Sequence, residues 1–345
     1  MVPQVNKCGQ HNTERGAVHF DQTFAHGYNS SITKSSIWGS FNRGIHINKS
    51  PGVTVTDTVI HGSIGNGVDV DQSNDVSLIG NLASGAVRRS ERLTEMLQET
   101  ANFKLCPYFP CRNLQAHNNV AGGSHHYGFL SQNDPNACGQ TVSHFTGNTA
   151  HSTRAGLIWL ENRAGVSCFV LNNFNVWKTV EAGIFFERRI TTIIVRNVFS
   201  SDNNIGFMLN PSTGRPSSVI FEDSLIVGES ANGGCGSASS STSCAARDAW
   251  SGCSSALPHA RLGIVVPSYL HGPKWFPRVK PFPYSNVKMD DQSFEINGVI
   301  IRNVTFVNWT KVDGCFRTRA AIATNAGQSG ECILYRKPCS DRCVV

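Results

Sequence analysis

Three side chains have the types and the spacing of a site for acid–base chemistry: His46, Asp69 and Asp71. Asp69 and Asp71 are two residues apart, so in a β-strand they share a face. His46 precedes Asp69 by 23 residues (69 − 46 = 23), which is also the offset of an internal repeat. Carboxylates on an outer sheet face can act as a general base or hold a cation. The alternative is a solvated polar ladder with no chemistry.

The internal repeat predicts the fold that positions these side chains. Residues 39–60 align without gaps on residues 62–83. The matching pairs are Gly39/Gly62, Gly44/Gly67, Ile45/Val68, Ile47/Val70, Ser50/Ser73, Val53/Val76 and Val55/Leu78, and looser copies surround Gly128, Gly156, Gly183 and Gly206. Short β-runs divided by Asn, Gly, Asp and Ser turns at this period predict an all-β, right-handed parallel β-helix, a solenoid of the pectin-lyase type. With coils about 4.8 Å apart and Ile45 inward, His46 faces outward below Asp69.

One continuous β-helix domain over residues 1–345 is expected, interrupted where the period breaks. A helical patch over Ser90–Thr100 lies inside the first break. The expected departures are insertions at 84–113 and 229–262, a strap rich in proline and aromatic residues at 267–292, and a Cys-rich C-terminal segment at 313–345. Solenoids often place recognition surfaces on such insertions, although capping loops are an equal alternative.

Further along the chain, the outward position of the coil changes from polar to apolar. The equivalent residues after four repeat glycines are Leu130, Ile158, Phe185 and Met208. Four stacked apolar side chains form an exposed stripe, which monomers rarely leave bare. We expect the strap at 267–292 to cover it; the alternatives are an interface with a second copy or another domain, and a sugar-binding platform.

Metal binding is not expected. His125 and His126 are sequence neighbours, so they face opposite sides of a strand and are interpreted, with His144 and His151, as turn or coil residues. Asp69, Asp71 and Asp75 offer calcium ligands, but they lack the glycine and terminal glutamate of an EF-hand loop. We expect no cofactor, with calcium as the alternative.

Twelve cysteines favour an oxidising compartment, because they lack the paired spacing of a zinc site. The expected disulfides are Cys106–Cys111, Cys315–Cys332 and Cys138–Cys168. Sequons at Asn29, Asn303 and Asn308 indicate a glycoprotein. Both features predict an extracellular or cell-surface location.

The charge balance and the hydropathy argue against nucleic acid and membranes as partners. Charged residues make up 16% of the chain, the formal net charge is +6, and no Lys/Arg run stands out, so nucleic acid is not an expected partner. No stretch is apolar enough to enter a membrane, and the N-terminus lacks the apolar core of a signal peptide. An extracellular composition without a signal peptide suggests part of a longer chain.

An ordered series of motifs resembles a known family. The motifs are, in chain order, GAVHFDQTF, SSIWGSFNRGIHI, NNVAGGSHHYGF, GNTAHSTRAGL, DNNIGFML, DSLIVGESAN, GIVV and GVIIRNVTFVNW, and the likeness covers roughly residues 17–332. In this order they resemble the β-helix region of fibrocystin and fibrocystin-L, a region shared with hyaluronan-degrading cell-surface proteins that carry a G8 domain. The resemblance implies a module of a large extracellular or membrane-tethered protein.

The resemblance also bears on catalysis. It implies a general-base pair at His19 and Asp21, but the family often has His-Phe-His where this chain has His19-Phe20-Asp21. The family's Glu-Asp-Gly after the second repeat corresponds to Asp71-Gln72-Ser73, which keeps one carboxylate, and the G8 domain is absent. These departures weigh against an enzyme.

We therefore expect an extracellular, disulfide-braced and glycosylated module with a structural, adhesion or assembly role, filaments included. Its expected partners are other copies or domains of a larger surface protein. The alternative is a glycoside hydrolase or polysaccharide lyase that acts on hyaluronan or another anionic glycan. That alternative uses the His46, Asp69 and Asp71 ladder or the His19 and Asp21 pair.

Overall fold

The structure is a computed structural model of residues 1–345. It describes residues 3–10, 15–23, 29–87, 100–106, 111–131, 144–159, 168–186, 192–209, 218–230, 260–266, 287–289, 293–296, 299–309, 318–325, 332–334 and 342–344. The chain divides into two compact units, Met1–Asn175 and Val176–Val345. Each is described by itself.

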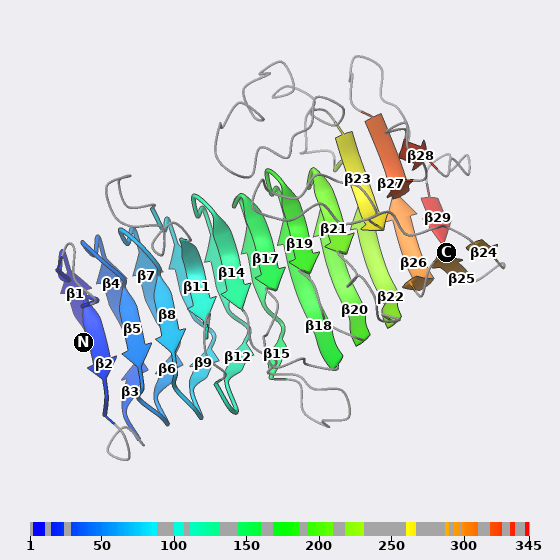
Figure 1. The fold of residues 1–345 in the computed structure, drawn as a ribbon. Coiled ribbons are helices and arrows are strands. Elements are labelled where there is room, and N and C mark those ends of the chain that lie inside the picture. Colours follow the sequence, from blue (N-terminus) through cyan, green and yellow to red (C-terminus); the bar gives the residue numbers. More distant parts are fainter. Residues whose placement is uncertain are drawn as a thin grey trace. The chain divides into compact units, whose positions relative to one another are not determined.

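The first unit is built from coils that each add one strand to a parallel sheet, called the first sheet. Its strands run side by side from blue to green in Figure 1. They are β2 (Val18–Asp21), β5 (Ile45–Asn48), β8 (Val68–Asp71), β11 (Ala101–Leu105), β14 (Tyr127–Ser131) and β17 (Ala155–Trp159). Equivalent residues of successive coils are in register, as Ile45 is with Val68 and Asn48 with Asp71. The predicted parallel β-helix is confirmed.

The second sheet of this unit receives two short strands from most coils and, at its end, one ten-residue strand, Cys168–Trp177. They are β1 (Gln4–Asn6), β3 (Ser31–Thr33), β4 (Ser36–Trp38), β6 (Thr54–Thr56), β7 (Val59–His61), β9 (Ser77–Ile79), β10 (Leu82–Ser84), β12 (Gln115–His117), β13 (Val120–Gly122), β15 (Phe145–Thr146), β16 (Thr149–His151) and β18 (Cys168–Trp177). Their pairing with the next coil is also parallel.

Side chains from the two sheets meet in a narrow core. Phe103 of β11 stacks on Phe129 of β14, with ring centroids 4.9 Å apart. Phe129 in turn meets Phe145 of the second sheet edge to face, at an interplanar angle of 86°. The aliphatic residues of earlier coils, such as Ile45 and Val68, have no exposed surface. These contacts between the two sheets show which face of each first-sheet strand points into the core.

The bend between the paired short strands contains a buried asparagine ladder. Asn119 Oδ1 accepts hydrogen bonds from the backbone nitrogen and from Nδ2 of Asn81, both at 3.0 Å. Asn148 Oδ1 accepts the same two bonds from Asn119, at 2.9 and 3.1 Å. Each Nδ2 also donates to a backbone carbonyl, which for Asn119 is that of Leu78. The ladder satisfies the polar groups that a buried turn leaves open.

Glycine is required at the repeat positions for two different structural reasons. Gly39 and Gly62 adopt the left-handed conformation, with φ of 60° and 68°. Gly67 instead lies against the next coil: a Cβ there would come within 2.6 Å of the carbonyl oxygen of Asn102. Only glycine allows that approach.

The second unit repeats the two-sheet coil. One sheet holds β19 (Ala182–Phe186), β21 (Ile205–Leu209), β23 (Ala260–Val266) and β27 (Thr318–Asn325). The other holds the long strands β20 (Thr192–Ser201), β22 (Ser218–Val227) and β26 (Val299–Val307), and these pair in parallel. Antiparallel additions follow: β24 (Val287–Met289), β25 (Ser293–Ile296), β28 (Cys332–Leu334) and β29 (Arg342–Val344).

The expected departures from the repeat are narrower than predicted. The segment 84–113 contains β11, a regular rung paired with β8 and β14, so residues 101–105 are not an insertion. Strand β23 likewise begins at Ala260, inside the segment 229–262. Strand β24 lies within the predicted strap and pairs antiparallel with β25, while residues 267–286 and 290–292 of the strap lie outside the described residues.

The structure describes no α-helix. The predicted helical patch over Ser90–Thr100 lies outside the described residues apart from Thr100, which is not helical. In the described part of the chain, no helix has the length and apolar character needed to cross a bilayer.

Candidate functional site

The first four coils place an outward row of ionisable side chains on the first sheet. His19 of β2 is in register with His46 of β5, and His46 with Asp69 of β8. Lys104 of β11 continues the row above Asp69. The register of His46 and Asp69 is the one expected from the repeat. Lys104 was missed, because it lies in a segment interpreted as an insertion.

Asp69 is the centre of this row and is held on several sides. Its Oδ2 accepts hydrogen bonds from Arg43 Nε at 2.5 Å and from Asn66 Nδ2 at 2.9 Å. Only 3% of Asp69 is exposed. Burial alone raises the pKa of Asp69, but the charges of Arg43, Lys104 and His46 and the Asn66 hydrogen bond outweigh it and lower that pKa from 3.8 to about 2. The side chain is therefore an ionised, buried carboxylate at neutral pH.

The two histidines stack on each other below Asp69. The rings of His19 and His46 are parallel within 23°, and their centroids are 4.6 Å apart. His46 is 4% exposed, while His19 is half-buried. This geometry places one imidazole beside the carboxylate and the other at the open end of the row.

A second row runs parallel to the first, two residues further along each strand. It contains Asp21, Asn48 and Asp71, and Asn48 Nδ2 donates to Asp21 Oδ1 at 2.8 Å. Burial, and then the charge of Asp69, raise the pKa of Asp71. Gln72 Nε2 donates to Asp71 Oδ2 at 3.4 Å, whereas Oδ1 is buried and accepts no hydrogen bond from the described residues.

Asp69 and Asp71 thus form a carboxyl pair whose pKa values are shifted in opposite directions. Two residues of a strand span roughly 6.6 Å, so the two carboxyl groups lie near each other on one face. A pair of this kind is the usual arrangement for one proton donor and one proton acceptor. Here the low-pKa partner is enclosed by Arg43 and Asn66, which restricts its access to a substrate.

Above Lys104 the outward row becomes apolar, as predicted, but it is not exposed. Leu130 and Ile158 continue the register and have no exposed surface. Leu130 points outward because Phe129, its neighbour along β14, contacts the second sheet. Phe185 of the second unit is 2% exposed and is in register with Met208, which is half-buried. These outward side chains are therefore covered rather than bare, as expected, but residues 267–286 of the predicted strap lie outside the described residues. Both the strap as the cover and the role as an interface stay predictions.

The other histidines lie on separate parts of the coils. His125 is exposed and His126 half-buried in the bend before β14, and His126 Nδ1 accepts a weak hydrogen bond from the backbone of Thr100 at 3.4 Å. Burial lowers the pKa of His151 on β16. Backbone bonding ties His144 to Ala116. Among the residues that the structure describes, no group of three or more His, Cys, Asp or Glu side chains can hold a metal ion.

One expected disulfide is present. Cys106 and Cys111 are bonded, with Cα atoms 5.9 Å apart, directly after β11. Cys138 and Cys315 lie outside the described residues, and the side chains of Cys168 and Cys332 are not described. The other two pairings stay predictions.

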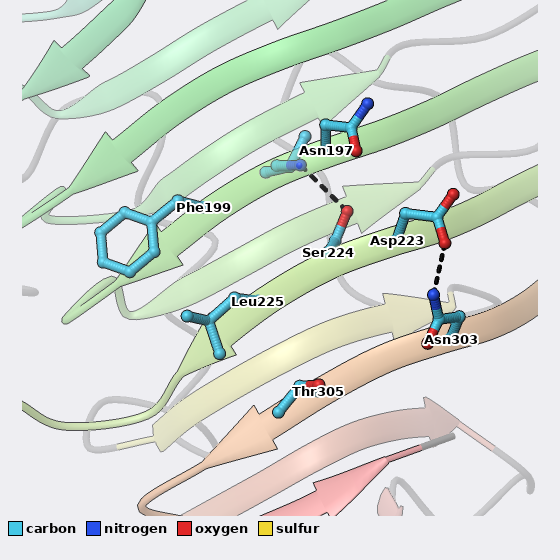
Figure 2. A pocket seen from close by; sticks show the side chains of 8 residues that line it. Asn197, Phe199, Asp223, Ser224, Leu225, Asn303 and Thr305 are labelled. Atoms are coloured by element: carbon cyan, nitrogen blue, oxygen red, sulfur yellow. Dashed lines mark hydrogen bonds between the residues drawn. The ribbon is translucent and has the colours of Figure 1, made fainter.

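The three predicted glycosylation sites differ in their surroundings. Asn29 lies in a turn with φ of 75°. Asn308 Nδ2 donates to the backbone oxygen of Glu229 at 2.9 Å. Asn303 is exposed, and its Nδ2 donates to Asp223 Oδ1 at 2.5 Å. It lines an open groove of about 410 Å³ across β20, β22 and β26 (Figure 2).

Comparisons with known proteins return solved structures alone. No family model and no curated protein matches the chain. The catalytic domain of a GH87 α-1,3-glucanase in complex with nigerose aligns with a TM-score of 0.40 and 14% identity, over 66% of this chain and 49% of that one. A variant of that domain in complex with tetrasaccharides aligns at 0.36 and 13% over the same shares. The chain thus spans about half the length of these structures.

Proposed function

We propose that the chain is a non-catalytic module of an extracellular surface protein, with a structural, adhesion or assembly role. The observation that carries this proposal is the state of Asp69. Its carboxylate is 3% exposed and accepts hydrogen bonds from Arg43 and Asn66. Asp69, which the sequence repeat placed at the centre of the candidate catalytic site, is thus part of a buried structural cluster.

Electrostatics supports the same reading. A general base works best with a pKa near the working pH, whereas the pKa of Asp69 is about 2. To accept a proton it would have to leave Arg43, and a buried charge without its partner is costly. The cluster therefore braces the outer face of the coil.

The extracellular setting is supported by the disulfide between Cys106 and Cys111 and by the cysteine content of the chain. The motif series that resembles the fibrocystin β-helix region points to the same setting.

The outward residues Leu130 and Ile158 are buried, so this face does not present a row of sugar-stacking rings.

A second candidate is an enzyme acting on polysaccharides, favoured by one observation. The pKa of Asp71 is raised while that of its neighbour Asp69 is lowered. Asp71 is only half-buried and so can reach a substrate as a proton donor. In this reading His19 and Asp21 lie at the open end of the same face.

An activity assay separates the two candidates. The purified chain is incubated with hyaluronan and with other anionic polysaccharides, and new reducing ends and unsaturated uronates are measured. We expect no depolymerisation. Cleavage that is lost in Asp71→Asn but kept in Asp57→Asn, an exposed carboxylate on the bend between β6 and β7, would establish the enzyme instead.

A further inference from the structure

A groove on the second unit has two chemically different sides. It crosses the three long strands β20, β22 and β26 and has a volume of about 410 Å³. Figure 2 shows Phe199, Leu225 and Thr305 along one side and Asn197, Asp223 and Asn303 along the other. The groove is open to solvent rather than enclosed, so a group bound there would lie along the surface of the strands.

The apolar side is formed by equivalent positions of successive coils. Phe199 is in register with Leu225, and Leu225 with Thr305. Leu225 is 36% exposed, which is high for a leucine in the middle of a strand. Phe199 beside it is half-buried. Leu225 and Phe199 therefore make the apolar side of the groove accessible to solvent.

The polar side is formed by three residues with left-handed backbone. Asn197, Asp223 and Asn303 have φ of 55°, 51° and 50°, which Asn and Asp tolerate better than other residues. All three are exposed. The hydrogen bond from Asn303 Nδ2 to Asp223 Oδ1 holds the Asn303 amide at the edge of the groove.

Asn303 also begins the sequon Asn303-Val304-Thr305, so two of its three residues line the groove. At the neighbouring sequon Asn308 is also exposed, but it lies outside the groove. Its Nδ2 donates to the backbone oxygen of Glu229, and the ring of the next residue, Trp309, donates to the carbonyl of Ile226. A glycan at Asn303 would start inside the groove.

We propose that Asn303 carries an N-glycan whose first sugars lie in this groove against Leu225 and Phe199. The linkage forms between Nδ2 and C1 of an N-acetylglucosamine. The donor is a polyprenyl-diphosphate oligosaccharide, whose C1–O bond breaks so that the polyprenyl diphosphate leaves, and Nδ2 loses one proton to solvent. The remaining N–H on Nδ2 keeps a donor for Asp223.

The two sides of the groove suit a sugar chain. The C–H face of a pyranose ring and the acetyl methyl group cover Leu225 and Phe199, which removes apolar surface from water. The hydroxyl groups face Asn197, whose amide donates and accepts hydrogen bonds, and Asp223, whose carboxylate accepts them. The glycan thus turns an exposed apolar strip into a covered one.

This inference rests on the secretory setting of the proposed function. The chain is therefore produced with a secretion signal in a eukaryotic host, and glycopeptides are mapped by mass spectrometry. We expect a glycan at Asn303 in the parent and in Thr305→Ser, and none in Thr305→Ala. An unmodified Asn303 beside modified Asn29 or Asn308 overturns the inference and leaves the proposed function standing. An unmodified chain with reduced cysteines contradicts both.

A second measurement tests the packing of the glycan in the groove. The glycans are removed enzymatically from three folded proteins: the parent, Leu225→Ser and Thr305→Ala. Thr305→Ala is the control for glycans elsewhere, because it loses the Asn303 sequon and keeps the other sequons. We expect deglycosylation to lower the melting temperature of the parent by about 2 to 4 °C. The drop should be smaller in Leu225→Ser and smallest in Thr305→Ala. Equal drops in all three proteins show that the sugars do not contact the groove, and they overturn that part of the inference.

Discussion

At the scale of single residues, Asp69 and Asp71 show how position on one strand decides the state of a carboxyl group. Both point outward from β8, and both are removed from water to some degree. Asp69 has Arg43, Lys104, His46 and Asn66 around it, which together hold it ionised. For Asp71, burial and the negative charge of Asp69 outweigh the long bond from Gln72 and the weaker attraction of Lys104 and Arg43, so its pKa is raised. The charge on Asp71 therefore works against folding.

The substitution Asp71→Asn is expected to stabilise the protein at neutral pH. Because the pKa of Asp71 is raised in the folded state above 3.8, its stabilising contribution is complete below that value and is lost as the pH rises through the folded pKa. Asparagine removes the unfavourable charge. We expect a melting temperature higher by about 2 °C at pH 7, and no difference from the parent at pH 3.

The matched control is Asp57→Asn, which changes an exposed carboxylate at a left-handed position that asparagine also tolerates. Its melting temperature should stay close to that of the parent at both pH values. A lower melting temperature for Asp71→Asn at pH 7 would contradict the account, because it would mean that the ionised carboxylate of Asp71 has a stabilising partner.

The site was predictable from the sequence in its register but not in its surroundings. The offset of 23 residues (69 − 46 = 23) was sufficient to place His46 beside Asp69, since a constant period aligns equivalent residues. Arg43 and Asn66 lie in the bend before each strand, where the direction of a side chain does not follow the alternation of a strand. Their bonds to Asp69 decide its accessibility, and no sequence pattern encodes them.

At the scale of elements, the asparagine ladder is the feature on which the bends of the first unit depend. Asn119 bonds to the coil below through Oδ1 and to the coil above through its backbone nitrogen and Nδ2. It has no exposed surface. Each asparagine of the ladder therefore bonds to polar groups on both neighbouring coils, and removing its side chain breaks several hydrogen bonds at once.

We expect Asn119→Ala to lower the free energy of unfolding by more than about 2 kcal/mol, because a buried polar group left without a partner costs about 1 to 3 kcal/mol and each further lost hydrogen bond about 0.5 to 1.5 kcal/mol. The backbone nitrogen of Asn81 loses its bond to Asn119 Oδ1, and the carbonyl of Leu78 loses the bond from Asn119 Nδ2. Asn81 Nδ2 and Asn148 Oδ1 each lose one bond, but they keep those to the Val55 carbonyl and from the Asn119 backbone nitrogen. Denaturant unfolding of the purified variant measures the change.

Asn175→Ala provides the comparison, since Asn175 is exposed on β18. Its effect should stay within about 0.5 kcal/mol. Similar losses in the two variants would mean that the ladder contributes no more than an ordinary surface asparagine, in which case water replaces its bonds.

The elements also show where sequence patterns stop being informative. The repeat of Gly44 and Gly67 was visible in the alignment because a close approach between coils permits no side chain. Strand β11 was not recognised, because Lys104 occupies an outward position and the Cys106–Cys111 loop follows directly. A charged residue that alternates with Phe103 and Leu105 is regular for a strand, but the break in the period hid it.

At the scale of the whole molecule, the low share of charged residues follows from the fold. Each coil buries a narrow column of side chains, and its turns need Gly, Asn and Asp for left-handed backbone. The outer faces are occupied by ladders of neutral residues such as Thr33 and Thr56, whose hydroxyl groups bond at 3.2 Å. A charge fraction of 16% is therefore compatible with a folded, turn-rich solenoid rather than a sign of an apolar surface.

The redox state of the cysteines is a property of the whole chain, and measuring it tests whether the chain folds in an oxidising compartment. Twelve cysteines in a protein of an oxidising compartment should be largely paired, because disulfides persist there and not in the cytosol. Cys106 and Cys111 are bonded, whereas Cys8 is an exposed thiol among the described cysteines. Without reduction, we expect an alkylating reagent to label Cys8, and to label Cys106 and Cys111 only after reduction.

The measurement is the intact mass of the secreted chain, alkylated under denaturing conditions with and without prior reduction, followed by peptide mapping. Cys8→Ser is the control, and it should lose the label that appears without reduction. The mass difference between the two samples counts the cysteines in disulfides. Labelling of all twelve cysteines in the unreduced sample would contradict both the oxidising compartment and the extracellular role, since the loop closed by Cys106 and Cys111 would then be open.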